Sequence, residues 1–267
     1  MGKKILIVDN DHFMLEFMGE LLSEQGHDVK KAEDGLSALE ILKEYVPDIV
    51  FADLIMPNIS GDRLCRVIRK MPQLKDVYLA IVSATVAEEP NRFAELGADT
   101  SIAKGPLDEM SRSILAVLDN ADRASSYGPE ETAIGLQGIY RRGITEELLS
   151  VRRHLETILN NISEGVLELN GEGKIIFANN VALSLFDGSE ARLLGHEFVR
   201  LFEGSDRQKI DASLKDIGSG LPETIDPFTV QMNSEKILLK ILPVEDNMIW
   251  SVIVIAVPLK KLPCSKG

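Results

Sequence analysis

The first 121 residues alternate between short continuous apolar runs and longer segments with helical periodicity. Each apolar run is followed by apolar residues three and four positions apart, the spacing of one face of a helix. Continuous apolar strands that alternate with helices are typical of a parallel sheet covered on both faces. The pattern therefore predicts a doubly wound, five-stranded α/β domain over residues 1–121. Its strands are expected at Ile5–Val8, Val29–Ala32, Ile49–Ala52, Val77–Ser83 and Thr100–Ala103.

A change of pattern follows Ala121. Residues 122–143 contain paired serines, a Gly-Pro pair and several further Gly residues, which predict a linker. Apolar residues then recur at alternating steps of four and three, as at the a and d positions of a coiled coil. They are Ile144, Leu148, Val151, Leu155, Ile158 and Ile162. A connector helix over 144–162 is expected, either as a parallel coiled coil in a homodimer or as an amphipathic helix packed on its own domain.

The last hundred residues predict a second, α+β domain over 155–258, with a tail at 259–267. An Asn- and Gly-rich turn at Asn170–Gly173 separates two alternating runs, which is typical of a β-hairpin. Asn179 and Asn180 are expected to cap the first of several short helices. Three further strands are expected at Phe228–Met232, Ile237–Leu242 and Met248–Val257.

Charge and cysteine content narrow the possible classes of protein. The net charge of −13 argues against non-specific binding to nucleic acid or anionic lipid. No helix-turn-helix pattern or basic patch follows the first domain, so we expect no DNA-binding output. The two cysteines, Cys65 and Cys264, fit a reducing compartment and no zinc or disulfide framework. The first apolar run is too short for a signal peptide or membrane span, so a cytoplasmic protein without membrane attachment is expected.

Chemically active residue types follow four of the predicted strands. Because the carboxyl ends of parallel strands meet at one edge of a sheet, these residues are expected to converge there. A carboxylate such as Asp53 at the end of a buried strand is costly unless it is paired, bound to metal or used chemically. The four groups are Asp9-Asn10-Asp11, Asp53, Ser83-Ala84 and Lys104-Gly105-Pro106.

This set resembles the receiver (CheY-like) domain of two-component response regulators, whose D-x-x-M-P-x-x-x-G loop is present from Asp53 to Gly61. The resemblance implies a flavodoxin-like fold in which Asp53 accepts a phosphoryl group from a sensor histidine kinase. Such a domain catalyses only its own phosphorylation and dephosphorylation and is not otherwise an enzyme. The resemblance also implies that Mg²⁺ is held by Asp9, Asn10, Asp53 and the backbone carbonyl of Ile55, and that Ser83 and Lys104 contact the phosphoryl group.

Three positions depart from the family pattern. Asn10 stands where a second acid is usual, which removes one negative charge from the metal site. Ser101 replaces the usual switching aromatic residue, and Gly105 separates Lys104 from Pro106. These departures leave open a pseudo-receiver, a binding module that signals through partner contacts or a ligand of the second domain without phosphorylation.

Two other interpretations of single residues are weaker. Asp9-Asn10-Asp11 also matches the D-x-D of haloacid dehalogenase phosphatases, but that family leaves the Asp53 loop unexplained. We expect Asp11 to cap the following helix rather than to bind metal, because Asp is favoured at that position. His154 lacks the proline context of a phosphorylated kinase histidine, so no such role is expected.

The second domain resembles a PAS domain. The matching segments are I-L-N-x-I-x-E-G-V from Ile158 to Val166 and a looser I-x-F-A-N-x-A that ends at Ala182. The resemblance implies a domain that holds a ligand between sheet and helices or mediates dimerisation. The sequence identifies no PAS ligand, and His196 is expected on a helix start rather than on haem. We expect a homodimer formed through the connector helix and the PAS domain.

Overall fold

The computed structural model describes residues 2–84, 96–127, 132–134, 143–186, 188–218, 225–232, 235–246 and 249–259. The chain divides into two compact units, Met1–Val151 and Arg152–Gly267. Within the described ranges, no helix is long and apolar enough to span a membrane. Parts of the predicted linker (128–131 and 135–142) and of the predicted tail (260–267) lie outside the described residues.

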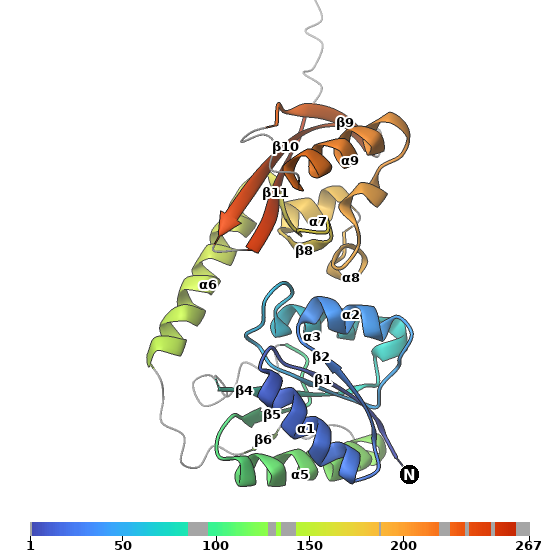
Figure 1. Ribbon diagram of the computed structural model, residues 1–267, viewed down its shortest axis with the longest axis vertical. Helices are drawn as coiled ribbons and strands as arrows, with labels where there is room; N and C mark the ends of the chain where they lie inside the picture. Colours follow the sequence, from blue (N-terminus) through green and yellow to red (C-terminus); the bar gives the residue numbers. More distant parts are fainter. Residues whose placement is uncertain are drawn as a thin grey trace, which may run out of the picture. The chain divides into compact units, whose positions relative to one another are not determined.

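The first unit is built on a parallel sheet with strand order β2-β1-β3-β4-β5-β6 (Figure 1). The five predicted strands are present, and β1 pairs with both β2 and β3. Reversal of the strand order at β1 places a crevice at the carboxyl ends of β1 and β3, where ligands of open α/β sheets bind. The strands are β1 Lys4–Val8, β2 Asp28–Ala32, β3 Ile49–Ala52, β4 Tyr78–Ser83, β5 Thr100–Ala103 and β6 Thr132–Ile134.

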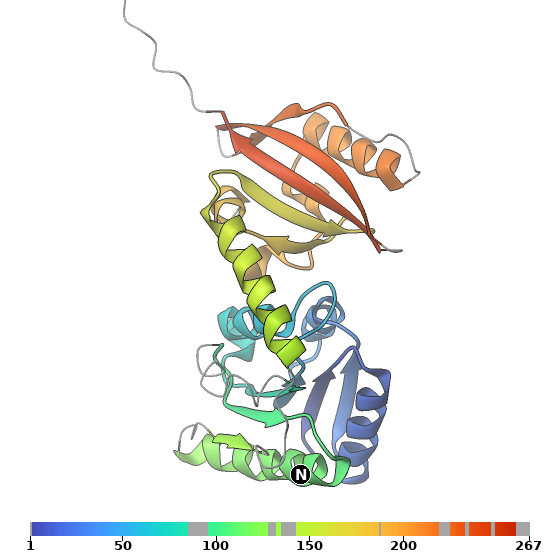
Figure 2. The same cartoon turned by 90° about the vertical axis from the view of Figure 1, so that its left-hand side faces the viewer.

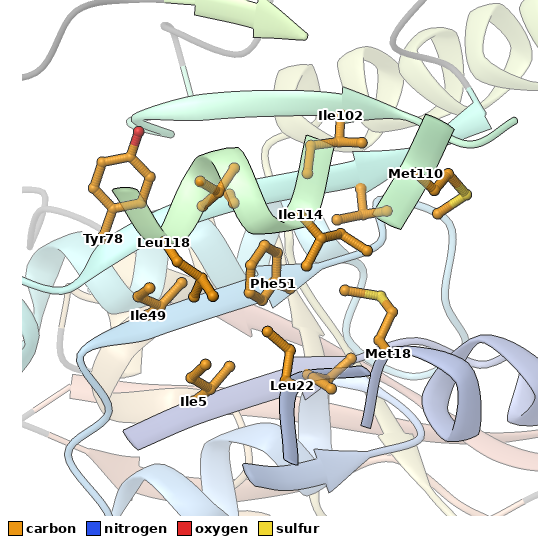
Figure 3. Packing of buried hydrophobic residues seen from close by; sticks show 14 of the residues in the cluster. Ile5, Met18, Leu22, Ile49, Phe51, Tyr78, Ile102, Met110, Ile114 and Leu118 are labelled. Atoms are coloured by element: carbon orange, nitrogen blue, oxygen red, sulfur yellow. The ribbon is translucent and has the colours of Figure 1, made fainter. Parts of the chain in front are cut away.

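Helices cover both faces of this sheet. Side chains of α1 and α5 pack with Ile5, Ile49, Phe51 and Ile102 in one apolar cluster (Figure 3). The helices α2 and α3 lie over the opposite face (Figure 1). This two-sided burial explains why β3 and β4 are buried at every position. The helices are α1 His12–Glu24, α2 Gly35–Leu42, α3 Gly61–Lys70, the 3₁₀ turn η1 Pro72–Leu74 and α5 Leu107–Tyr127.

The segment expected as a linker carries more structure than its composition indicates. Helix α5 continues past Ala121 to Tyr127, and β6 adds a sixth strand beside β5. Thr132 lies opposite Thr100 in the parallel register. Pairing with β6 satisfies backbone groups of β5 that an edge strand leaves free.

The second unit contains an antiparallel sheet with strand order β8-β7-β11-β10-β9 (Figure 2). The predicted hairpin is confirmed: β7 and β8 pair, and Asn170 Oδ1 accepts hydrogen bonds from the amides of Glu172 and Lys174 in the turn. The strands are β7 Gly165–Asn170, β8 Ile175–Ala178, β9 Phe228–Met232, β10 Glu235–Asp246 and β11 Ile249–Pro258.

Short helices cover one face of this second sheet. Phe186, Phe198 and Phe202 pack edge to face between them, with ring centroids 5.2–6.1 Å apart. Strand residues such as Leu239 and Val254 are fully buried. The helices are α7 Asn180–Phe186, α8 Glu190–Leu193, the 3₁₀ turn η3 Phe198–Leu201 and α9 Gly204–Gly218.

The connector helix α6 spans Gly143–Asn161, close to the predicted range of 144–162. Three of its predicted seam residues are exposed in the single chain: Val151 at 52 %, Leu155 at 54 % and Ile158 at 47 %. We call these three side chains the α6 stripe. Exposed apolar side chains at this spacing are those that a coiled-coil partner covers.

Candidate functional site

The predicted site residues stand at the carboxyl ends of neighbouring strands. Asp9 follows β1, Asp53 follows β3, Ser83 ends β4 and Lys104 follows β5. Backbone hydrogen bonds continue the sheet to this edge: the amide of Asp53 donates to Val8 O at 2.9 Å, and that of Lys104 donates to Ser83 O at 3.1 Å. The strand ladder therefore fixes the backbone from which each side chain projects.

One ammonium group joins the two acids. Lys104 Nζ lies 2.7 Å from Asp9 Oδ2 and 2.8 Å from Asp53 Oδ2. Asp9 is 1 % exposed and Asp53 is 7 % exposed, so both carboxylates are largely removed from water. Two buried carboxylates at such close range are tolerated because a cation lies between them.

Backbone amides hold the other oxygen of each carboxylate. Asp53 Oδ1 accepts hydrogen bonds from the amides of Leu54 at 2.6 Å and Ile55 at 3.4 Å. Asp9 Oδ1 accepts one from the amide of Asp11 at 2.9 Å. Each carboxylate therefore turns one oxygen to its own loop and the other to Lys104.

The electrostatics of the site follow from this burial. Desolvation raises the pKa of Asp9 above its ordinary value, although the charge of Lys104 opposes the shift. Burial by itself lowers the pKa of Lys104, but the charges of Asp53 and Asp9 outweigh it, and the pKa is raised. Lys104 is therefore a permanent cation at neutral pH.

The two remaining residues of the acidic loop are less enclosed. Asn10 is exposed, and the prediction that Asp11 caps α1 is confirmed, because its side chain accepts a hydrogen bond from the amide of Phe13 at 2.9 Å. Hard divalent cations prefer oxygen ligands, and the Asp9 and Asp53 carboxylates already attract one cation, Lys104. The donor set expected for Mg²⁺ thus fits its chemistry, with one charge fewer because of Asn10.

The sequence interpretation assigned no role to two residues near the site, Asn58 in the loop after β3 and Asp34 before α2. The Asn58 amide donates a hydrogen bond to Asp34 Oδ2, and Asp34 Oδ1 caps α2 by accepting from the amide of Ser37 at 2.7 Å. Asn58 has a φ of 57°, in the left-handed region that Asn tolerates better than most residues. An Asp before Gly35 is a recognisable N-cap signal, but its contact with Asn58 is not local in sequence.

Glycine is required at Gly61, the last position of the loop motif. A Cβ there would collide with the carbonyl oxygen of Asp53. Helix α3 therefore begins directly against the backbone of Asp53, which fixes the loop at both ends.

Comparison with known proteins agrees with this architecture. Residues 5–114 match the family model for the response regulator receiver domain, and residues 153–218 match a PAS domain model. The chain is 32 % identical over 104 residues to the chemotaxis protein CheY of Halobacterium salinarum, covering 39 % of this chain and 86 % of that protein.

Two further relatives come from bacteria. An uncharacterized transcriptional regulatory protein of Bacillus subtilis, YrkP, is 28 % identical over 191 residues, covering 70 % of this chain and 80 % of that protein. The sensor histidine kinase RcsC of Salmonella typhimurium is 33 % identical over 113 residues, covering 42 % of this chain but 12 % of the kinase. The chain belongs to the response regulator receiver family of two-component signalling, with a PAS domain after the receiver.

Proposed function

We propose that Asp53 accepts a phosphoryl group from a sensor histidine kinase in the cytoplasm and that this event controls a dimeric connector and PAS module. The observation that carries the proposal is the position of Lys104, whose ammonium lies 2.8 Å from Asp53 Oδ2 and 2.7 Å from Asp9 Oδ2. A carboxylate attacks phosphorus only if its repulsion with the phosphoryl oxygens is offset, and this cation offsets part of it.

The proposed transfer is a single displacement. An Asp53 carboxylate oxygen forms the new O–P bond as the bond from phosphorus to the donor histidine nitrogen breaks, and the imidazole leaves with the electron pair. Lys104 then exchanges its contact with the carboxylate for one with the phosphoryl group. The Ser83 hydroxyl, at the end of β4, donates to another phosphoryl oxygen.

A divalent cation completes the proposed charge balance. Asp9, Asn10, Asp53 and the Ile55 carbonyl would hold Mg²⁺, which would supply positive charge to offset the negative charge of the phosphoryl group. The chain's own contribution is to keep Asp9 ionised beside Lys104 despite its burial and to hold the Asp53 loop through the amides of Leu54 and Ile55.

Three exposed apolar side chains around this edge support a protein as phosphodonor. Phe13 at the start of α1 is 58 % exposed, Ile55 after β3 is 42 % exposed, and Leu107 at the start of α5 is 41 % exposed. Each belongs to a different segment that follows a strand of the site. Apolar groups that surround a polar centre are suited to binding another protein surface.

The α6 stripe supports the dimeric part of the proposal. Val151, Leu155 and Ile158 present about half of their surface to solvent in one chain. Covering them with a second copy of α6 removes this apolar surface from water, which is the driving force of a coiled coil.

The test is phosphorylation of the full chain by acetyl phosphate with Mg²⁺, followed by intact-mass analysis. We expect one added phosphoryl group in the wild type and none in Asp53→Ala. Asp11→Asn serves as the matched control, because Asn also caps helices well, and it should be phosphorylated like the wild type. Failure of the wild type to gain mass would refute the proposal.

One observation favours a second candidate, a pseudo-receiver that works without phosphorylation. Asn10 stands where the family has a second acid, so Asp9 and Asp53 are the two carboxylates of the expected metal-ligand set. The Mg²⁺ affinity of the full chain separates the two functions. Binding at millimolar or lower Mg²⁺ supports phosphotransfer, and its absence supports the pseudo-receiver.

A further inference from the structure

The side chain of Asn179 is the point where the connector helix meets the second domain. It is 0 % exposed and lies between the end of β8 and the start of α7. As predicted, it caps α7: its Oδ1 accepts a hydrogen bond from the amide of Ala182 at 2.9 Å. The same oxygen accepts a second hydrogen bond, from the amide of Val166 in β7, also at 2.9 Å.

The other half of this amide faces α6. Asn179 Nδ2 donates to the carbonyl of Leu159 at 2.7 Å and to that of Glu164 at 2.9 Å. Leu159 O is one of the last four carbonyls of α6, which have no partner within the helix. The side chain thus makes all four hydrogen bonds available to a primary amide, two as donor and two as acceptor.

A second contact reinforces the same junction. The amide of Asn180 donates to Asn160 Oδ1 at 3.0 Å, so the last turn of α6 is bound to the first turn of α7 at two adjacent positions. Gly165 at the start of β7 lies close against α7 in the same region, because a Cβ there would lie 3.0 Å from the Leu185 side chain and 3.2 Å from Ala182 Cα. Helix α6 runs from this junction without interruption back to Gly143 (Figure 2).

We propose that Asn179 is a positioning residue that rigidly joins α6 to the PAS core, so that the rotational setting of the α6 stripe is fixed relative to β7 and α7. Its donor half holds the helix and its acceptor half holds the core. A displacement of α6 therefore acts on β7 and α7 together, and a displacement of β7 or α7 acts on α6. This inference does not depend on phosphorylation of Asp53.

Because the oxygen and the nitrogen of the Asn179 side chain bind different parts of the domain, one substitution can remove the contacts of the nitrogen alone. Asn179→Asp keeps an oxygen to accept from Val166 and Ala182. It replaces the donor nitrogen by a second oxygen, which repels the carbonyls of Leu159 and Glu164. A negative charge at a helix C-terminus is also unfavourable. The substitution therefore cuts the bond to Leu159 in α6 and the bond to Glu164 between α6 and β7, and it leaves those to Val166 and Ala182.

Hydrogen exchange with mass spectrometry on the full, unphosphorylated chain measures the result. We expect the amides of residues 158–164 to exchange about tenfold faster or more, because two partly buried hydrogen bonds are lost. Protection in β7, α7 and β11 should stay as in the wild type. Asn170→Asp is the matched control: Asn170 Oδ1 only accepts from the turn amides of Glu172 and Lys174, so the end of α6 should not respond.

Two results would overturn the proposal. Unchanged exchange at 158–164 would show that Asn179 does not hold the helix. Faster exchange spread equally over the sheet would show a residue that only stabilises the domain. If circular dichroism shows that Asn179→Asp does not fold, Asn179→Ser keeps an oxygen that can cap α7, lacks the donor nitrogen, and is judged by the same two criteria.

Discussion

Asn58 donates a hydrogen bond from its side-chain amide to Asp34, and this contact ties the loop after Asp53 to the start of α2. Asp34 is 9 % exposed and also caps α2. The loop that carries Ile55 is thus held by a residue from a different βα connection. Its shape depends on this tertiary contact as well as on its own sequence.

Substitutions at Asn58 should separate its backbone role from its side-chain role. Asn58→Gly keeps the positive φ of 57° accessible but loses the bond to Asp34, and should cost about 1 kcal/mol of unfolding free energy. Asn58→Ala loses the bond and adds backbone strain, so it should cost about 1 kcal/mol more. Urea denaturation measures both. An Ala variant as stable as the Gly variant would contradict the strained geometry.

Lys104→Met should destabilise the receiver and make its stability strongly pH-dependent. Removing the ammonium leaves two buried carboxylates without their cation at pH 7, at a cost of about 3 kcal/mol. The cost should shrink as the pH falls toward 4, because Asp9, whose pKa burial already raises, then takes up a proton. Lys75→Met, which removes an exposed ion pair with Asp76, is the control and should change stability little.

In the wild type, the stabilising contribution of Lys104 should be lost at high pH. The folded pKa of Lys104 is raised above its ordinary 10.5, so its stabilising contribution is fully present below that value. The contribution is lost as the pH rises through the folded pKa. Urea titrations between pH 9 and pH 12, in the wild type and in Lys104→Met, should converge at the alkaline end. Parallel curves would contradict the ion-pair assignment.

Asn10→Asp should strengthen Mg²⁺ binding by about tenfold, since it adds a negative charge beside Asp9 and Asp53. Asn10 is exposed, so the new carboxylate carries little desolvation cost. Isothermal titration with Mg²⁺ measures the affinity. Asp11→Asn is the charge control, because Asp11 caps α1 by accepting from Phe13, and it should leave the affinity nearly unchanged. Equal affinities for wild type and Asn10→Asp would place Asn10 outside the metal site.

The sequence predicted the parts of the fold that depend on local periodicity. Buried parallel strands form short, mainly apolar runs, so β1, β3 and β4 were identifiable, and the shorter β5 was identifiable from Ile102 and Ala103 beside Thr100. Strand β6 was not, because three residues within a segment of loop composition carry no period. It is recognisable only beside β5, whose backbone it pairs.

The candidate site was also predictable only in part. The convergence of Asp9, Asp53 and Lys104 was predictable, because strand ends of a parallel sheet share one edge. The contacts of Asn58 and Asn179 were not, since their partners Asp34 and Leu159 lie 24 and 20 residues away. Asn179 gave a correct N-cap signal, but a cap uses only its oxygen. The donor contacts of Asn179 could not be predicted, because they depend on how α6 packs against the second domain.

Leu155→Asp should abolish the proposed dimer. Leu155 is 54 % exposed in the centre of the α6 stripe, so the single chain tolerates a charge there, whereas a coiled coil would bury two charges against each other. The dimer dissociation constant should rise by about a hundredfold, a loss of roughly 3 kcal/mol. Sedimentation velocity over a range of concentrations measures it. Thr157→Asp, two residues along on another exposed side of α6, is the matched control and should leave the association unchanged.

If the wild type sediments as a monomer at every concentration, a second copy does not cover the stripe. If both variants dissociate the dimer equally, the contact lies elsewhere and charge alone weakens it. Loss of the dimer in Leu155→Asp alone would assign the interface to the stripe, whose setting Asn179 controls.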